Sequence, residues 1–384
     1  MGVEQMYGVS TSGPRFLVVD AQVHAWDASP HNQAGPAGEE FAADLLRRHR
    51  ELDRTRGAGG AATAVPPVPP EEVERVSEDG LHRDLFDAGV DRAVLQPVVL
   101  GDLFVLGFSP VAWHAELAER MPGRFVLSGE LDPGAGQAGA RGIGPMVRRW
   151  DLRGLTLCEG RRPGRLVRLA DPWVRRVLAR CSKAGAGVVH LGVSPSAQPA
   201  PWRRWDPVPG SFGPRLPNWA EPVRAISALP VRTNVVQRVP SAAFDVAHFR
   251  ELARALPRVQ FVLGAGCLPG DQLRHLARLP NVHIVLTEML PWIGSREFIT
   301  AFGELLQAFG SERLLFGSGY PMVRPGRLVG ELSRFQFPDG SPYPRLDDAA
   351  RQAILGGNAA RLYRIPIPAG VCAQRRTGAA AGRA

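Results

Sequence analysis

Two histidines lie in or beside short apolar runs of this sequence, where they could do acid/base chemistry. His24 follows the run Phe16–Val19, and His190 lies within the run Gly187–Leu191. A neutral imidazole can take up or release a proton near neutral pH, and it can also bind a divalent metal. A histidine on a strand can equally be a core residue with satisfied hydrogen bonds. The helices and strands around both histidines must show which of these roles each one has.

Two glutamates and two cysteines also follow apolar runs. Cys158 and Glu159 come after one run, Cys267 after another and Glu288 after a third. An acid/base pair of either histidine with Glu288 needs only hydrogen-bond reach to a substrate. For each cysteine, a buried apolar role is the stronger interpretation. Glu159 and Glu288 could equally be held by arginines in structural ion pairs.

The elements that must position these residues alternate along the chain. Short β-branched runs and amphipathic helical patterns follow one another from about residue 90, which is typical of a parallel sheet covered by helices. The predicted strands are Phe16–Val19, Ala93–Val99, Phe125–Leu131, Leu152–Leu157, Gly187–Leu191, Val231–Val236, Val259–Leu263, Val282–Leu286 and Arg313–Phe316. Val231–Val236 is the most polar and is interpreted as an extra strand or an extended loop. We therefore predict an α/β fold, a (β/α)₈ TIM barrel, in one domain of the 384-residue chain.

Apolar residues at three- and four-residue spacing predict the helices between these strands. The predicted helices are Pro172–Ala184, Phe244–Ala255, Gly270–Arg278 and Arg296–Phe309. Asp171 and Ser295 precede two of them as N-caps.

Two long segments interrupt the alternation. Residues 28–80 include the Gly/Ala/Pro-rich tract Gly57–Pro70, and residues 194–222 are rich in proline and tryptophan. Both follow predicted strands, so in a barrel they would lie on the C-terminal face, as lids or as loosely ordered insertions. We divide the chain into an N-terminal extension (1–15), a barrel (16–365) and a disordered tail (366–384).

Six motifs resemble those of the amidohydrolase-related family and occur in the family's order. They are Val18–Trp26, Phe86–Val94, Pro122–Phe125, Leu152–Leu155, Arg313–Pro321 and Ile354–Tyr363. The family is similar to decarboxylases of carboxymuconate semialdehyde and of aromatic hydroxy acids, and to pyrone-dicarboxylate lactonases. The resemblance therefore implies a TIM barrel with hydrolase or decarboxylase activity on a small, carboxylated substrate.

The resemblance also implies a divalent metal, but this chain departs from the usual ligands. His24 and His190 match two ligand positions, whereas Gln22, Ala265 and Gly319 stand where two histidines and an aspartate belong. Alanine and glycine offer no ligand, and an amide oxygen is a weak partner for zinc. We expect no cofactor, or at most a weakly bound zinc or manganese at His24 and His190. A soft site that adds Cys267 is conceivable.

The remaining site predictions concern the substrate. His24, His190 and Glu288 are the predicted catalytic residues. Gln22, Trp26, Glu159 and Arg324 are predicted to bind the substrate, although solvated loop arginines are the simpler interpretation for Arg324. The only lysine, Lys183, lies in the predicted helix before Gly187–Leu191, so neither a carboxylated-lysine bridge nor a Schiff base is expected.

Composition limits the classes of partner that this chain is expected to bind. The net charge of +9 comes almost entirely from scattered arginines, without the dense basic stripe that nucleic-acid binding requires. No apolar stretch approaches the about 18 residues of a membrane span, and no secretory signal is readable. We therefore expect a cytoplasmic protein with a small-molecule substrate and no nucleic-acid or membrane partner. Homo-oligomerisation stays open.

The sequence leaves three functions open. The first is a hydrolase or decarboxylase that works with little or no tightly bound metal, for which lactone hydrolysis is the simplest reaction. The second is a catalytically inactive barrel that binds a ligand or a partner protein. The third is a conventional enzyme with an unusual metal, against which Gly319 weighs most.

Overall fold

A computed structural model describes residues 16–57, 69–98, 100–101, 103–131, 142–158, 172–192, 246–265, 274–287 and 289–366. Its eight strands form one sheet in chain order, and every neighbouring pair is parallel. They are β1 (Val19–Val23), β2 (Arg92–Leu95), β3 (Phe125–Leu131), β4 (Gly154–Cys158), β5 (Val188–Gly192), β6 (Gln260–Gly264), β7 (Val282–Val285) and β8 (Leu314–Leu315).

The first and last strands meet and close the sheet. The amide of Ala21 donates to the carbonyl of Phe316 at 3.0 Å, and Val23 forms a parallel bridge with Tyr320. Eight parallel strands in sequential order, closed in this way, form the predicted TIM barrel.

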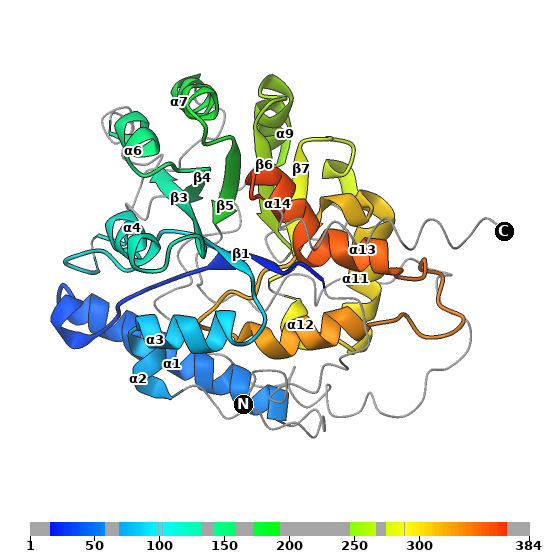
Figure 1. Cartoon of the computed structure of the whole chain (residues 1–384), viewed down its shortest axis with the longest axis horizontal. Helices are drawn as coiled ribbons and strands as arrows, with labels where there is room; N and C mark the ends of the chain where they lie inside the picture. The colour runs from blue at the N-terminus through cyan, green and yellow to red at the C-terminus, as the bar shows by residue number, and fades with distance from the viewer. Residues whose placement is uncertain are drawn as a thin grey trace.

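Helices surround the sheet (Figure 1). The α-helices are α1 (Pro36–Gly57), α2 (Pro70–Glu74), α3 (Glu78–Leu81), α4 (Val111–Arg120), α6 (Ile143–Arg149), α7 (Pro172–Lys183), α9 (Val246–Ala255), α11 (Arg296–Phe309), α12 (Pro325–Arg334), α13 (Asp348–Gln352) and α14 (Asn358–Leu362). Shorter 3₁₀ or π turns are η2 (Pro30–Asn32), η3 (His82–Phe86), η8 (Leu290–Trp292), η9 (Ser311–Arg313) and η10 (Ala353–Gly357). Within the described residues, no helix is both long and apolar enough to cross a membrane.

Two apolar clusters hold these layers together. The barrel interior is filled mainly by alternate strand residues and closed by residues of the last helix: Leu17, Val19, Ala21, Val94, Val188, Val262, Val285, Leu315, Ala359, Ala360, Tyr363 and Ile365. A larger cluster fills the space between the strands and the helices. The alternation arises because successive side chains of a strand point to opposite faces.

The first strand begins later than predicted. It spans Val19–Val23 instead of Phe16–Val19, and its register shifts between Asp20 and Val23. The polar residues Asp20 and Gln22 belong to this strand, because the amides of Gln22 and Ser318 donate to one oxygen of Asp20 within the fold.

One predicted helix is confirmed, and other predicted segments differ from the structure or lie outside the described residues. Arg296–Phe309 coincides with α11, and the Ser295 hydroxyl accepts from the amide of Phe298 as an N-cap. Residues 28–80 contain α1, α2 and all but the last residue of α3, which composition did not predict. These three helices lie together near α12 in Figure 1. Val231–Val236, residues 194–222 and the tail from residue 367 lie outside the described residues.

A close approach at Gly356 packs the closing turn η10 against the chain just before β1. A methyl group at Gly356 would overlap the carbonyl oxygen of Leu17. We predict that Gly356→Ala lowers the free energy of unfolding by about 1–3 kcal/mol, as overpacking typically does. Urea denaturation measures this change.

The matched control is Gly144→Ala in α6, where an added methyl group meets only the tip of Arg148 at 4.0 Å. This substitution should leave stability unchanged or raise it by up to about 1 kcal/mol. Equal losses in the two variants would show that the approach at Leu17 is not the cause.

Candidate functional site

The predicted site residues gather at the C-terminal ends of the strands. Gln22 lies in β1 and His24 directly follows it, while His190 lies in β5. Ala265 follows β6, and Gly319 follows β8 by a few residues. This end of a TIM barrel carries the active site in characterised enzymes of this fold. Glu159, Glu288 and Cys267 lie outside the described residues.

His24 is held in one orientation by backbone and ring contacts. Its Nδ1 lies 2.8 Å from the carbonyl oxygen of Gln96, and its ring stacks on Trp26 with a centroid distance of 6.2 Å. A carbonyl can only accept, so this contact assigns the proton to Nδ1 and leaves a lone pair on Nε2. Burial lowers the pKa of His24 to about 4, against a smaller opposing effect of the Gln96 hydrogen bond. The ring is therefore neutral at pH 7 and is equipped to act as a base.

Gln96 joins His24 to the centre of the barrel. The side-chain amide of Gln96 donates to the carbonyl of Ala21 at 3.2 Å and to the hydroxyl of Tyr363 at 3.4 Å. Its oxygen accepts from the Thr156 hydroxyl at 2.5 Å. Sequence reading missed this residue, whose only signal is a glutamine inside an apolar run.

Two further histidines are buried close to His24. His190 in β5 is 3% exposed, and His114 in α4 is fully buried. Burial, reinforced by the nearby charge that His24 would carry if protonated, lowers the pKa of each to about 3. His114 lies 2.9 Å from the Ser109 hydroxyl, and Nδ1 of His190 has no hydrogen-bond partner among the described residues. Sequence reading found His190 but missed His114, which is hidden in a helical pattern.

The positions of the expected metal ligands hold Gln22, Gly319 and Ala265, which make other contacts. The Thr287 hydroxyl donates to the Gln22 side-chain oxygen at 2.9 Å, which leaves the Gln22 amino group as a donor. Gly319 has a φ of +68°, and a Cβ there would lie 2.6 Å from the Thr287 methyl group. Ala265 is buried and carries no ligand atom.

The described residues of this region do not form the ligand set of a conventional divalent-metal site. Among the residues that the structure describes, no three His, Cys, Asp or Glu side chains come together in a way that could hold a metal ion. The Gln22 oxygen is engaged by Thr287. The Thr287 methyl group also restricts the space that an aspartate at 319 would need.

Asp20 is a buried carboxylate beneath this arrangement. One of its oxygens accepts from the amides of Gln22 at 3.1 Å and Ser318 at 2.9 Å. Burial raises the pKa of Asp20 to about 6, although the hydrogen bonds from Ser318 and Gln22 oppose the shift. Its contacts brace the ends of β1 and β8, which carry Gln22 and Gly319.

Two predicted substrate-binding residues are engaged by the protein itself. Trp26 is 1% exposed, and its indole nitrogen donates to the carbonyl of Val73 at 2.6 Å. Arg324 lies 3.3 Å from the carboxylate of Asp84 and 3.5 Å from that of Glu72. In this arrangement Trp26 supports the His24 ring, and Arg324 belongs to an ion-pair cluster.

Comparison with known proteins identifies the family of this chain. Residues 19–365 match the amidohydrolase family model, so the chain belongs to the amidohydrolase family. The chain is 33% identical to an L-fucono-1,5-lactonase from Burkholderia multivorans over 106 residues, which are 25% of this chain and 35% of the lactonase. The chain thus aligns with only about a third of that relative.

Solved structures show the same fold at low identity. An uncharacterised TIM-barrel protein from Bordetella bronchiseptica matches with a TM-score of 0.55 and 17% identity, covering 90% of this chain and 98% of that one. A 2,6-dihydroxybenzoate decarboxylase from Rhizobium matches with a TM-score of 0.53 and 14% identity, covering 91% and 99%. At these identities the likeness shows the fold alone.

The hydrogen bonds of the Gln96 side chain are expected to contribute to the free energy of unfolding. Gln96→Leu removes the donors to Ala21 and Tyr363 and the acceptor for Thr156, leaving buried polar atoms unpaired. We expect the free energy of unfolding to fall by about 1–3 kcal/mol or more, measured by urea denaturation. Gln307→Leu, which removes one exposed hydrogen bond to Pro342, is the control and should change stability by about 0.5 kcal/mol or less. Comparable losses would contradict the assigned role of Gln96.

The contact between Gly319 and Thr287 makes a second prediction. Gly319→Asp should destabilise the protein, because the left-handed φ and the Thr287 methyl group both oppose a side chain. Thr287→Ser removes that methyl group and keeps the hydroxyl. The cost of Gly319→Asp should therefore be smaller in the Thr287→Ser background by about 0.5–3 kcal/mol, measured as a double-mutant cycle of unfolding free energies. Strict additivity would show that Thr287 does not restrict this position.

Proposed function

We propose that this amidohydrolase-family protein hydrolyses a small, carboxylated lactone or related ester, with little or no tightly bound metal. The observation that carries the proposal is the hydrogen bond from His24 Nδ1 to the Gln96 carbonyl. It leaves Nε2 as a base at the C-terminal end of the barrel, while Ala265 and Gly319 lack the ligands of a metal-dependent relative.

Lactone hydrolysis needs only a water molecule, a base and a donor for the oxyanion. His24 Nε2 takes a proton from water as the water oxygen attacks the lactone carbonyl. The Gln22 amino group, oriented by Thr287, donates to the oxyanion that forms. As the ring C–O bond breaks, His24 returns the proton to the leaving oxygen, and the product is the open hydroxy acid.

His190 and Glu288 complete the proposed acid/base set. His190 pairs in register with Thr156, whose hydroxyl donates to Gln96, so it belongs to the same layer as the His24 support. Its Nδ1 is buried and has no hydrogen-bond partner among the described residues. Glu288 stays a proposed catalytic residue, and Glu159 stays a proposed substrate-binding residue.

The reaction type is also supported by comparison. The partial match to the fuconolactonase favours a lactone substrate, and the Rhizobium decarboxylase shares the fold. Hydrolysis is preferred over decarboxylation because the residues described here supply a base and an oxyanion donor. Small-molecule substrate use, a cytoplasmic location and the lack of nucleic-acid or membrane partners remain predictions.

A catalytically inactive, ligand-binding barrel is the second candidate. The loss of ligand side chains at Ala265 and Gly319 favours it, since no compensating ligand group is found among the described residues. The activity of the purified protein separates the two candidates.

The test is hydrolysis of a panel of sugar-acid and carboxylated lactones, followed with a pH indicator. We expect at least one lactone to be hydrolysed, and His24→Gln to lower kcat by about 10²- to 10⁴-fold through loss of the general base. His82→Gln is the matched control, because His82 is an exposed histidine paired with Asp87, and it should leave kcat unchanged. An inert protein, or an active one indifferent to His24→Gln, would refute the proposal.

The pH profile provides an independent prediction. His24 must be neutral to act as a base, and burial lowers its pKa to about 4, so the neutral form dominates above that value. We expect kcat/KM to fall on the acid side with a midpoint near pH 4 and to stay level from pH 5 to 7. A midpoint near pH 6 would instead assign the titration to Asp20.

A further inference from the structure

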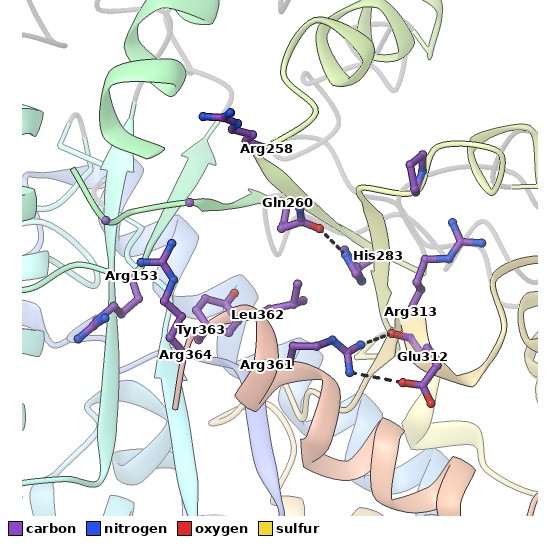
Figure 2. Close-up of a pocket in the computed structure, with 13 residues that line it drawn as sticks. Arg153, Arg258, Gln260, His283, Glu312, Arg313, Arg361, Leu362, Tyr363 and Arg364 are labelled. Atoms are coloured by element: carbon purple, nitrogen blue, oxygen red, sulfur yellow. Dashed lines mark hydrogen bonds and ion pairs between the residues drawn. The ribbon is translucent and has the colours of Figure 1, made fainter. Parts of the chain in front are cut away.

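A cavity of about 480 Å³ opens at the other end of the barrel, among residues that precede or begin the strands. Figure 2 shows its lining, which includes five arginines and one carboxylate: Arg153, Arg258, Arg313, Arg361, Arg364 and Glu312. Its size matches sites for small molecules. The excess of positive charge selects for anions.

Three of these arginines are already engaged. Arg313 donates to the backbone carbonyls of Ala277 and Leu279. Arg361 pairs with Glu312, and Arg153 pairs with Asp151. These contacts fix the walls of the cavity.

Arg258 and Arg364 are different. Neither has an ion pair or side-chain hydrogen bond among the residues that the structure describes, and both are exposed. They come from the segment before β6 and from the end of α14, and Figure 2 shows them among the lining residues. A guanidinium group offers paired donors that match the geometry of a carboxylate or phosphate.

His283 forms part of the wall of the same cavity. It is 4% exposed, and its Nε2 lies 3.0 Å from the side-chain oxygen of Gln260. Burial, with the charges of Arg313 and Arg361, lowers the pKa of His283 to about 4 and keeps the ring neutral. The positive charge of the cavity wall therefore comes from its arginines.

We propose that this cavity binds a small oxyanion, with its carboxylate or phosphate held by Arg258 and Arg364. The site is separate from the proposed catalytic residues. Tyr363 lines the cavity, and its hydroxyl accepts from Gln96 inside the barrel, so its side chain lies between the two sites.

The test is titration calorimetry at low ionic strength with citrate as the carboxylate probe and glycerol phosphate as the phosphate probe. We expect saturable binding of at least one probe, and the tighter one identifies the oxyanion. Arg258→Gln and Arg364→Gln should each weaken binding about tenfold or more. Arg176→Gln removes the same charge from an exposed position on α7 outside the cavity, and it should not change binding.

A second comparison tests the role of the anionic group. Glycerol has the carbon skeleton of glycerol phosphate without its phosphate group, and it should show no saturable binding. The proposal fails if no probe saturates, if Arg176→Gln weakens binding as much as the cavity variants, or if glycerol binds as tightly as glycerol phosphate.

Discussion

The hydrogen bonds of Gln96 are the interaction on which the rest of this structure depends. Its backbone carbonyl orients His24, and its side chain ties β1 to β4 and to Tyr363 at the end of α14. Because the amide is 1% exposed, each of these contacts replaces water in a low-dielectric interior, where an unpaired partner is costly. The orientation of the proposed base is therefore part of the stability of the barrel.

At the C-terminal end of the barrel, Gln22, Thr287 and Gly319 form a hydrogen-bonded and closely packed arrangement. Thr287 donates to the side-chain oxygen of Gln22, and its methyl group takes up space beside Gly319. Gln22 and Gly319 therefore fit the same neighbour, one through a hydrogen bond and the other through its lack of a side chain. This fit favours the proposed site, in which His24 and His190 act directly.

Local patterns predict much of the fold but little of the site. The run Phe125–Leu131 coincides with β3, and Arg296–Phe309 with α11, because strand alternation and helical spacing depend only on neighbouring residues. His24 and His190 were found because they lie on recognisable motifs. Gln96 could not be found in this way, since its partners Ala21, Thr156 and Tyr363 are 75, 60 and 267 positions away. The continuation of β1 past Val19 has the same origin, because one oxygen of Asp20 accepts from the amide of Ser318, which lies 298 positions further along the chain.

The central claim is that His24 acts as a base without a metal. Its most direct test is to measure zinc and manganese content and lactonase kcat/KM on the same preparation, before and after dialysis against a chelator. We expect far less than one metal ion per chain and an unchanged kcat/KM. Stoichiometric metal, with activity that is lost on chelation and regained on adding the metal, would contradict it.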